Sequence, residues 1–365
     1  MRIAFLTGSL EPERDGVGDY TRRLAGELIR QGHPSIILGL NDSQVSEAQF
    51  GSQEMEGTLI SVLRLPSMMP WNDRVRLSRK WLDAFNPDWV SLQFVPFAFQ
   101  PRGLPFGLPR HLKSIIGSRP LHWMFHELWV LWSFPLSLRK RLLGQCQKLW
   151  LRSCLRKLKP QAVATQLSLY QAELNKIGVA ADMVPLHGNI PVYPKHEADK
   201  WLADRCASLQ SPKQVKAGFF GNILSTLDSS LLAAWVAQLN IPGNELLLLS
   251  AGKIGGEGDK LWNSLEQKLK ASAMFVKLGE LDEREASFYL SAMDYGLTSY
   301  PPELMGKSGS VAAMREHGLP VISCGSLVRG SVGNTKNNCP TRDTDQPWTI
   351  NQSARFLLQH LQIRK

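Results

Sequence analysis

The sequence lacks the features that would place this protein outside the cell or across a membrane. Its five cysteines are odd in number and scattered, with no CxxC pair, which argues against a disulfide framework and for a reducing compartment. The short apolar run at the N-terminus has no signal-peptide cleavage pattern. No run of about eighteen apolar residues is free of charge. We therefore expect a cytoplasmic protein without a transmembrane helix.

Common motifs for cofactors and metals are missing as well. Gly16-Val17-Gly18 is not followed by a third glycine at Thr21, so the dehydrogenase fingerprint is incomplete. Lys307-Ser308-Gly309 lacks the spacing of a P-loop. No group of His, Cys, Asp or Glu shows metal-ligand spacing. The sequence predicts no bound cofactor and no required metal.

Acidic residues are outnumbered, 32 against 42 Lys and Arg, and the net charge of +10 suits an anionic partner. Nucleotide-sugar phosphates, an acidic membrane face and nucleic acid all qualify, but no nucleic-acid-binding module is recognisable, so no specific nucleic acid is expected. The chain of 365 residues, 43% of them hydrophobic, is long enough for two domains with cores of their own.

Short apolar segments alternate with amphipathic ones along the whole chain, which predicts α/β domains with parallel sheets. In the first half we expect strands at 2–7, 35–40, 59–65, 89–94, 121–125, 162–165 and 183–185, and helices at 19–30, 73–85, 105–116, 136–158 and 168–177. Asp19 is the expected N-cap of the first helix. In the second half we expect strands at 217–220, 245–250, 274–277, 295–299 and 319–324, and helices at 228–238, 258–271, 285–293, 310–317 and 349–361.

This alternation predicts two Rossmann-like doubly wound domains facing a cleft. We assign residues 1–190 to an acceptor-side domain, 191–215 to a linker region and 216–345 to a nucleotide-sugar domain. Residues 346–365 form a C-terminal helix that is a candidate to cross back to the first domain. Ligands of such sheets bind beyond the carboxyl ends of the strands.

One such strand end, after residues 295–299, leads into a glycine-containing turn that opens a helix. The turn Gly306-Lys307-Ser308-Gly309 offers backbone N–H groups, the positive end of a helix dipole and a lysine. It is either a nest for a phosphate or a plain turn with a solvated lysine. Nearby, Glu303 follows two prolines, so it is either a rigidly held ligand for sugar hydroxyls or a surface acid.

His126 is the other candidate, since it ends a strand of apolar and aromatic residues. A histidine in that setting is either a satisfied core residue or a ligand that hydrogen-bonds a sugar and stabilises developing charge. His122 is the weaker candidate.

Motifs in order along nearly the whole chain resemble the bacterial glycosyltransferases of the GT-B fold, in the retaining family 4 (group 1). They are Asp15-Gly16-Val17-Gly18-Asp19-Tyr20, Gly32-His33, Asn86-Pro87-Asp88, Phe125-His126-Glu127, Gly218-Phe219-Phe220-Gly221-Asn222, Gly279-Glu280-Leu281, Asp294-Tyr295-Gly296 and Gly318-Leu319-Pro320-Val321-Ile322. The resemblance implies a nucleotide-sugar donor, a saccharide or lipid-linked acceptor, and retention of anomeric configuration.

The same resemblance implies positions for the site. Gly16 and Gly18 would lie at the donor diphosphate, His126 at the sugar, and Glu303 would be the first of two family glutamates. The second would fall at Val311, which cannot bind hydroxyls. The family's Arg and Lys are missing from the segment that begins Gly221-Asn222, so we assign the charge to Lys307 and Lys253, beside Asn222, Ser308 and Gly309.

The long helix over 138–159 carries a row of basic residues. Arg141, Lys148, Arg152, Arg156 and Lys159 follow one another at spacings of 7, 4, 4 and 3. We expect them opposite a stripe of Leu138, Leu142, Leu149 and Leu158. Such a face is either simply solvated or a contact with anionic lipid at the inner face of the membrane.

Three functions remain open. The first is a glycosyltransferase, the reading that the resemblance favours. The second is a catalytically lapsed binding protein of the same fold, which Val311 and the missing cation pair favour. The third is a sugar-nucleotide epimerase, which shares the fold but needs no acceptor.

Overall fold

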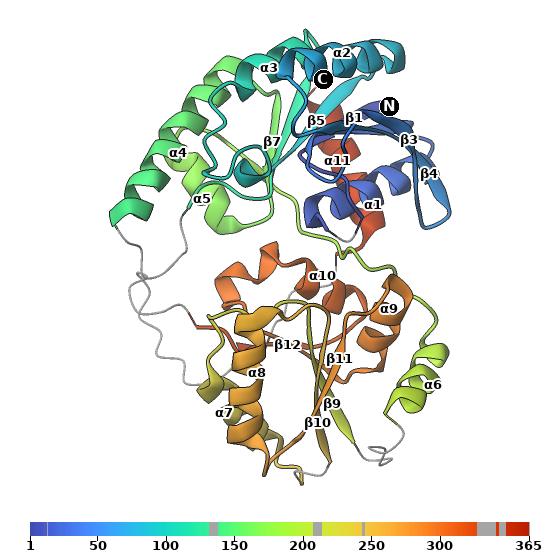
Figure 1. The fold of residues 1–365 in the computed structure, drawn as a ribbon, viewed down its shortest axis with the longest axis vertical. Helices are drawn as coiled ribbons and strands as arrows, with labels where there is room; N and C mark the ends of the chain where they lie inside the picture. Colours follow the sequence, from blue (N-terminus) through green and yellow to red (C-terminus); the bar gives the residue numbers. More distant parts are fainter. Residues whose placement is uncertain are drawn as a thin grey trace. The chain divides into compact units, whose positions relative to one another are not determined.

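The structure, a computed structural model, divides into two compact units. It describes residues 1–12, 14–130, 138–206, 214–242, 245–326, 341–342 and 348–364. The first unit comprises Met1–Pro185 together with Ile350–Lys365, and the second comprises Leu186–Thr349 (Figure 1). Parts of the predicted linker and of the predicted second domain, at 207–213, 243–244, 327–340 and 343–347, lie outside the described residues.

The first unit is built on an eight-stranded sheet with the order β3-β4-β2-β1-β5-β6-β7-β8. Its strands are β1 (Ile3–Thr7), β2 (Ser35–Asp42), β3 (Gln49–Met55), β4 (Thr58–Pro66), β5 (Trp89–Phe94), β6 (Leu121–Phe125), β7 (Ala162–Thr165) and β8 (Asp182–Met183). All pairs are parallel except β3 with β4. The central strands β1, β5 and β6 are buried along their whole length, which explains their continuous apolar sequences.

Helices lie on both sides of this sheet (Figure 1). They are α1 (Gly16–Arg30), α2 (Trp71–Phe85), α3 (Leu108–Ile116), α4 (Leu138–Leu158), α5 (Ser168–Lys176) and the C-terminal α11 (Ile350–Ile363), with a 3-10 turn η1 (Pro96–Ala98). Helix α1 packs on β2 and β4 and against α11, while α3 packs between α2 and α4. The C-terminal helix is thus part of the first unit, and its Asn351 donates a hydrogen bond to Glu27 of α1 over 3.1 Å.

The second unit has a six-stranded sheet with the order β11-β10-β9-β12-β13-β14. Its elements are α6 (Lys195–Arg205), β9 (Val215–Phe220), α7 (Ser229–Leu239), β10 (Leu246–Ala251), α8 (Gly255–Leu269), β11 (Met274–Gly279), α9 (Glu283–Ala292), β12 (Tyr295–Thr298), η3 (Pro302–Lys307), α10 (Gly309–Glu316), β13 (Val321–Ser323) and β14 (Thr341–Arg342). Among the strands in the described part of this unit, β14 pairs antiparallel with β13 and the other pairs are parallel.

Alternating leucines of β10 pack in two separate hydrophobic cores of this unit. Leu246 and Leu248 pack with α7 and α8, whereas Leu247 and Leu249 pack with α6, α9 and α10. Because neighbouring side chains of a strand point to opposite faces, helices cover both faces of the sheet. This is the doubly wound arrangement that the sequence predicts.

Three sequence-based expectations were wrong in the details of the fold. Strand β3 was not predicted, and it pairs with β4 through the positive-φ turn Glu56-Gly57. The N-cap of α1 is Asp15, not Asp19, because the Asp15 carboxylate accepts the N–H groups of Val17 and Gly18. The predicted linker contains helix α6, which packs on α9 of the second unit, since Ala198 and Leu202 are buried there.

The expected separation of leucines and cations on opposite faces of α4 was also wrong. Leu138, Leu142 and Leu149 are 77%, 65% and 67% exposed, on the same outer side as Arg152 and Arg156. The buried face is formed instead by Gly144, Gln147, Trp150, Leu151, Cys154 and Leu155. Two leucines, an aromatic ring, a thiol and a hydrogen-bonded glutamine therefore pack this face of α4 against the unit.

Across the ranges that the structure describes, every helix is too short or too polar to cross a membrane.

Candidate functional site

Two glycines bring the first loops of the second unit into backbone contact at the carboxyl edge of its sheet. Gly221 follows β9 with φ +80°, and Gly252 follows β10 with φ +93°. A Cβ on Gly252 would lie 3.1 Å from both the N and the Cα of Gly221. Only glycine fits this approach without strain, because an L side chain disfavours positive φ and would meet backbone atoms. The Gly221 N–H donates to the Ala251 carbonyl over 2.8 Å and the Gly252 N–H to the Gly279 carbonyl over 2.7 Å, so these two glycines shape the edge rather than offer amides to a ligand.

The N-terminus of α10 completes the same edge. Ser308 is its N-cap, and the Ser308 hydroxyl accepts the N–H of Val311 over 3.3 Å. A Cβ on Gly221 would lie 2.9 Å from the Ser310 hydroxyl, so the β9 loop and the start of α10 touch. The amides of an uncompensated first helical turn attract anions. Three segments that are far apart in the sequence thus converge on one candidate anion site.

The charged and polar residues predicted for this site lie on the loops that form this edge, and their side chains differ in exposure. Lys307 ends η3 directly before the Ser308 cap and is partly exposed. Lys253 and Asn222 are exposed on the loops after β10 and β9. Glu303 is exposed in the first turn of η3. The structure therefore places Lys307, Ser308 and Gly309 together at the helix start, with Lys253 and Asn222 on the two adjoining loops.

Ser299 organises these loops, and sequence reasoning missed it. Its hydroxyl accepts the N–H of Leu224 over 2.9 Å, and its carbonyl accepts the Thr226 hydroxyl over 2.7 Å. The β9 loop is thereby tied to the end of β12. A serine directly after a buried strand was the only signal in the sequence, and it is a weak one.

Position 311 faces the interior. Val311 is fully buried and packs with Met305 and Met314 in the core between α9, α10 and the sheet. A side chain at this point of α10 is directed away from the loops that form the edge. The missing second glutamate is therefore replaced by a core contact.

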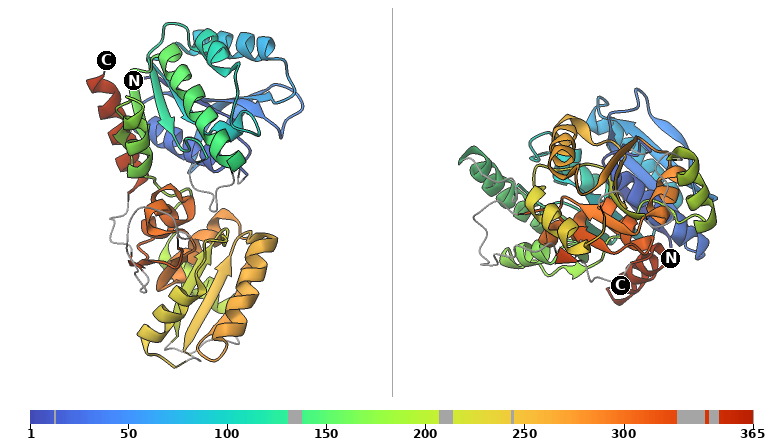
Figure 2. Two further views of the ribbon diagram at one scale, coloured as in Figure 1. Left: turned by 90° about the vertical axis from the view of Figure 1, so that its left-hand side faces the viewer. Right: turned by 90° about the horizontal axis from the view of Figure 1, so that it is seen from below.

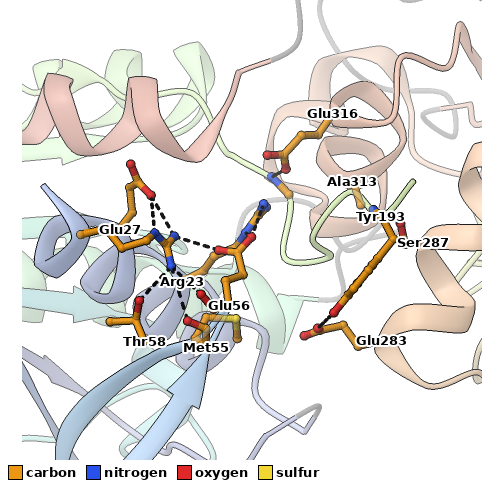
Figure 3. A network of polar contacts seen from close by, with 12 residues as sticks. Arg23, Glu27, Met55, Glu56, Thr58, Tyr193, Glu283, Ser287, Ala313 and Glu316 are labelled. Atoms are coloured by element: carbon orange, nitrogen blue, oxygen red, sulfur yellow. Dashed lines mark hydrogen bonds and ion pairs between the residues drawn. The ribbon is translucent and has the colours of Figure 1, made fainter. Parts of the chain in front are cut away.

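The segment before α6 lies against α10. Gly188 donates its N–H to Glu316 over 3.1 Å, and a Cβ on Gly188 would lie 2.9 Å from the Cα of Ala313 (Figure 3). The Asn189 side chain lies 3.6 Å from the position of a Cβ on Gly309. Asn189 therefore stands beside the first residue of the helix that carries the candidate anion site.

The corresponding edge of the first unit has a different chemistry. Asp15 caps α1 and occupies the N–H groups of Val17 and Gly18 at 2.9 and 3.0 Å. Burial raises the pKa of Asp15, and the neighbouring Asp42 also raises it, while the two amide hydrogen bonds lower it. Gly16 is open, since a Cβ there would meet nothing within 4 Å, whereas at Gly18 it would lie 3.0 Å from the Ser9 carbonyl.

His126 follows β6 and is almost fully buried. Its Nδ1 accepts a hydrogen bond from the Gln166 amide, and its Nε2–H donates to the Gln93 carbonyl, both over 2.8 Å. The Tyr20 ring of α1 packs edge-on at 4.8 Å between centroids. Burial lowers the pKa of His126 to about 3, so the ring is neutral at physiological pH. Both nitrogens are occupied, so a sugar hydroxyl would have to displace a glutamine amide to reach one.

Gln93, one of the two hydrogen-bond partners of His126, links it to a further chain of hydrogen bonds in the core. The Gln93 side-chain amide donates to the Ser91 hydroxyl over 2.7 Å, and that hydroxyl is hydrogen-bonded to His122 Nδ1 over 2.8 Å. Burial lowers the pKa of His122 to about 3, and His360 and His126 add smaller contributions. The hydrogen bond from Gln166 to Nδ1 sets the His126 ring as the tautomer protonated at Nε2. His122 is thus a core residue that holds Ser91 in place.

No group of three or more His, Cys, Asp or Glu side chains within the described ranges has the geometry to hold a metal ion.

Comparison with known proteins identifies the fold. No protein-family model matches the sequence, and no curated protein matches it. Among solved structures, Anabaena HepE in complex with UDP and glucose has a TM-score of 0.55 at 14% identity, covering 99% of this chain and 90% of that chain. The catalytic domain of starch synthase IV from Arabidopsis thaliana, bound to ADP and acarbose, has a TM-score of 0.55 at 14% identity, covering 100% and 92%.

A UDP-GlcNAc 2-epimerase from Methanocaldococcus jannaschii is also similar, with a TM-score of 0.50 at 11% identity over 100% of both chains. The chain has the GT-B fold, with two Rossmann-like α/β units, as the sequence predicts. At these identities the likeness extends to the fold alone.

Proposed function

We propose that the protein is a glycosyltransferase that moves a sugar from a nucleotide-diphosphate-sugar donor to a saccharide or lipid-linked acceptor, with retention of anomeric configuration. The observation that carries the proposal is the edge of the second unit. There Gly221 and Gly252 bring the loops after β9 and β10 against the start of α10, whose first-turn N–H groups follow directly after a lysine. A diphosphate is the ligand that suits such a site.

The solved structures of this fold support the proposal, since HepE is described with UDP, with UDP and glucose, and with UDP-glucose, and starch synthase IV with ADP. In this chain the amides of the first turn of α10 and the Lys307 ammonium would hold the departing diphosphate. Stabilising that leaving group lowers the barrier for cleavage of the bond to the sugar. Glu303 would orient sugar hydroxyls from the exposed turn η3. We propose no metal and no cofactor in this step.

Calorimetric titration of the protein with UDP, ADP and GDP, followed by assay with the matching nucleotide sugars, tests the proposal. We expect one nucleoside diphosphate to bind, and Lys307→Ala to weaken it ~10- to 100-fold, the value of a hydrogen bond to a charged group. Lys260→Ala, an exposed lysine on α8, is the matched control and should leave affinity unchanged. Unchanged affinity in Lys307→Ala would show that Lys307 does not contact the bound nucleotide.

A sugar-nucleotide epimerase is the second candidate, because epimerases share this fold over their full length. Isomerisation of the bound sugar without transfer to any acceptor would favour it. Absence of binding to every nucleotide tested would favour the lapsed binding protein, to which the buried Val311 points.

A further inference from the structure

Helix α4 has an unusual outer surface for a helix of a globular protein. It carries seven basic residues and no acidic one, namely Arg139, Lys140, Arg141, Lys148, Arg152, Arg156 and Lys157. Leu138, Leu142 and Leu149 project from the same helix and are about two-thirds exposed or more. Their spacings of four and seven residues place them on one face. Helix α4 therefore presents an apolar stripe to solvent between cations.

Three of these cations are directed outward without an ion pair in the part of the chain that the structure describes. Lys148 pairs with Glu173 over 3.4 Å and stacks on Trp129. Arg141, Arg152 and Arg156, by contrast, are exposed and form no ion pair with any residue in the described ranges. At 3.6 residues per turn, Arg152 and Arg156 continue the line of the leucines toward the C-terminal end of the helix. The stripe and the charges thus share one outer face.

Hollows at the C-terminal end of α4 extend this charged surface toward α3. Three adjoining cavities of about 530, 450 and 200 Å³ lie here, and none has an acidic residue in its lining. Lys159 lines all three, and Arg156 lines the two larger ones. Phe106, which is 74% exposed, stands at the lip of the second cavity beside Arg110. Each cavity offers cations around a space of the size of a phosphate-bearing headgroup.

The arginines of α1, in the same unit, are paired. Arg22 and Arg23 are buried and paired with Asp19 and Glu56, and Arg30 pairs with Glu27 and Glu56. Figure 3 shows Arg23, Glu27 and Glu56 of this network. Those arginines hold the fold together. A merely solvated face would account for the cations of α4 but not for three leucines in line among them.

We propose that the first unit docks on an anionic lipid bilayer through the outer face of α4 and the basic hollows beside α3. Helix α4 lies at the outer border of its unit in both Figure 1 and the view from below in Figure 2, and it packs inward on α3. The leucines enter the boundary between headgroups and acyl chains, and the arginines contact lipid phosphates. Charge complementarity and the in-line leucines favour a bilayer over a free polyanion, which has no apolar layer for the leucines.

Sedimentation of the full-length protein with vesicles tests this inference. Vesicles of phosphatidylcholine alone are compared with vesicles that also contain phosphatidylglycerol. We expect binding only to the anionic vesicles, weakened by salt. Arg152→Gln/Arg156→Gln should lower the partition coefficient ~25-fold, at roughly five-fold per cation. Leu142→Gln/Leu149→Gln should lower it at least ~10-fold through lost apolar burial.

Matched controls distinguish these effects from changes in charge or stability. Lys260→Gln/Lys270→Gln removes the same charge from the second unit, and Leu59→Gln replaces a leucine of similar exposure on β4. Both should bind vesicles as the unaltered protein does, and all variants should keep their circular dichroism and their nucleotide affinity.

Binding that is equal on neutral vesicles, or absent on both kinds, overturns the inference. So does loss in the arginine variant with full binding in the leucine variant. In that case a soluble polyanion is the partner, and binding of heparin or RNA by the unaltered protein would show it. These outcomes do not depend on nucleotide binding. The vesicle experiment therefore tests the docking surface independently of the proposed function.

Discussion

The two units offer the same backbone geometry at their functional edges but opposite charge. In each, a buried strand leads by way of a glycine loop to the N-terminus of a helix. Helix α1 is capped by the carboxylate of Asp15, which occupies two of its amides, whereas α10 is capped by the neutral hydroxyl of Ser308 with Lys307 directly before it. An added phosphate meets a like charge at α1 and a cation at α10.

The charges around α1 are also neutralised internally. Arg64 bridges Glu11 and Asp42, and Arg22 pairs with Asp19. We therefore expect the edge of the first unit to favour an uncharged, hydroxylated ligand, as the proposed acceptor sugar is, and the edge of the second to favour the proposed diphosphate. A single cap residue and its neighbour give the two helix starts their different charge.

The largest expected difference between the units is in their stability toward acid, which should destabilise the first unit. The pKa values of His122 and His126 lie at about 3 in the folded first unit, against an ordinary value of 6.5. Between those values the unfolded chain binds more protons, so stability is complete above about pH 6.5 and is lost as the pH falls. We expect the free energy of unfolding of the first unit to fall by up to ~1.4 kcal/mol per pH unit for each histidine.

Urea unfolding at pH 7 and pH 5 measures this loss. His126→Gln should reduce the slope with pH by one proton, because a glutamine there does not titrate. A pH-independent midpoint, or the same slope in the variant, would show that the histidines are not held neutral by burial.

Two glycines provide the next comparison. Gly252→Ala places a Cβ at φ +93° and 3.1 Å from the backbone of Gly221, so we expect a loss of ~1–3 kcal/mol in stability and much weaker UDP binding. Gly16→Ala adds a Cβ in open space at the start of α1 and should change stability by no more than ~0.5 kcal/mol. Thermal unfolding and calorimetry of the two variants compare them. Equal UDP affinity in the two variants would show that the contact between the β9 and β10 loops is not part of the donor site.

The caps should give the smallest but most specific difference. Asp15→Ala and Ser308→Ala each remove an N-cap and should cost ~1 kcal/mol in stability. Only Ser308→Ala should also weaken UDP binding, since Asp15 opposes an anion rather than binding one. Equal stability losses accompanied by an affinity loss in Asp15→Ala would place the diphosphate at α1.

Much of the fold was predictable because buried parallel strands have continuous apolar sequences. Strands β5, β6 and β7 have the bounds that the sequence predicts. Strand β3, with the sequence QFGSQEM, was missed because it lies at the sheet edge with most side chains exposed, so burial left no pattern in its sequence. Helix α6 was missed because only a few of its side chains, among them Ala198 and Leu202, reach the core.

The candidate site was predictable in its residues but not in its contacts. The sequence pointed to Lys307, Ser308 and Gly309 from a strand, a glycine turn and a helix in succession. The close approach of Gly252 to Gly221, and the hydrogen bonds of Ser299, depend on segments that meet only in the folded sheet. The face of α4 that packs inward was not predicted, because it includes Gln147, a polar residue that is buried with hydrogen bonds to the Val130 N–H and the Arg102 carbonyl.

Hydrogen exchange of the backbone amides tests the assignment of the donor diphosphate to the second unit most directly. Exchange is compared with and without saturating UDP, or the nucleotide that binds best. If the second unit holds the diphosphate, the nucleotide should slow exchange in peptides that contain Gly309–Val311 and Gly221–Asn222, and leave those that contain Gly16–Gly18 unchanged. Protection at Gly16–Gly18, with none at the start of α10, would contradict the assignment of the donor site to the second unit.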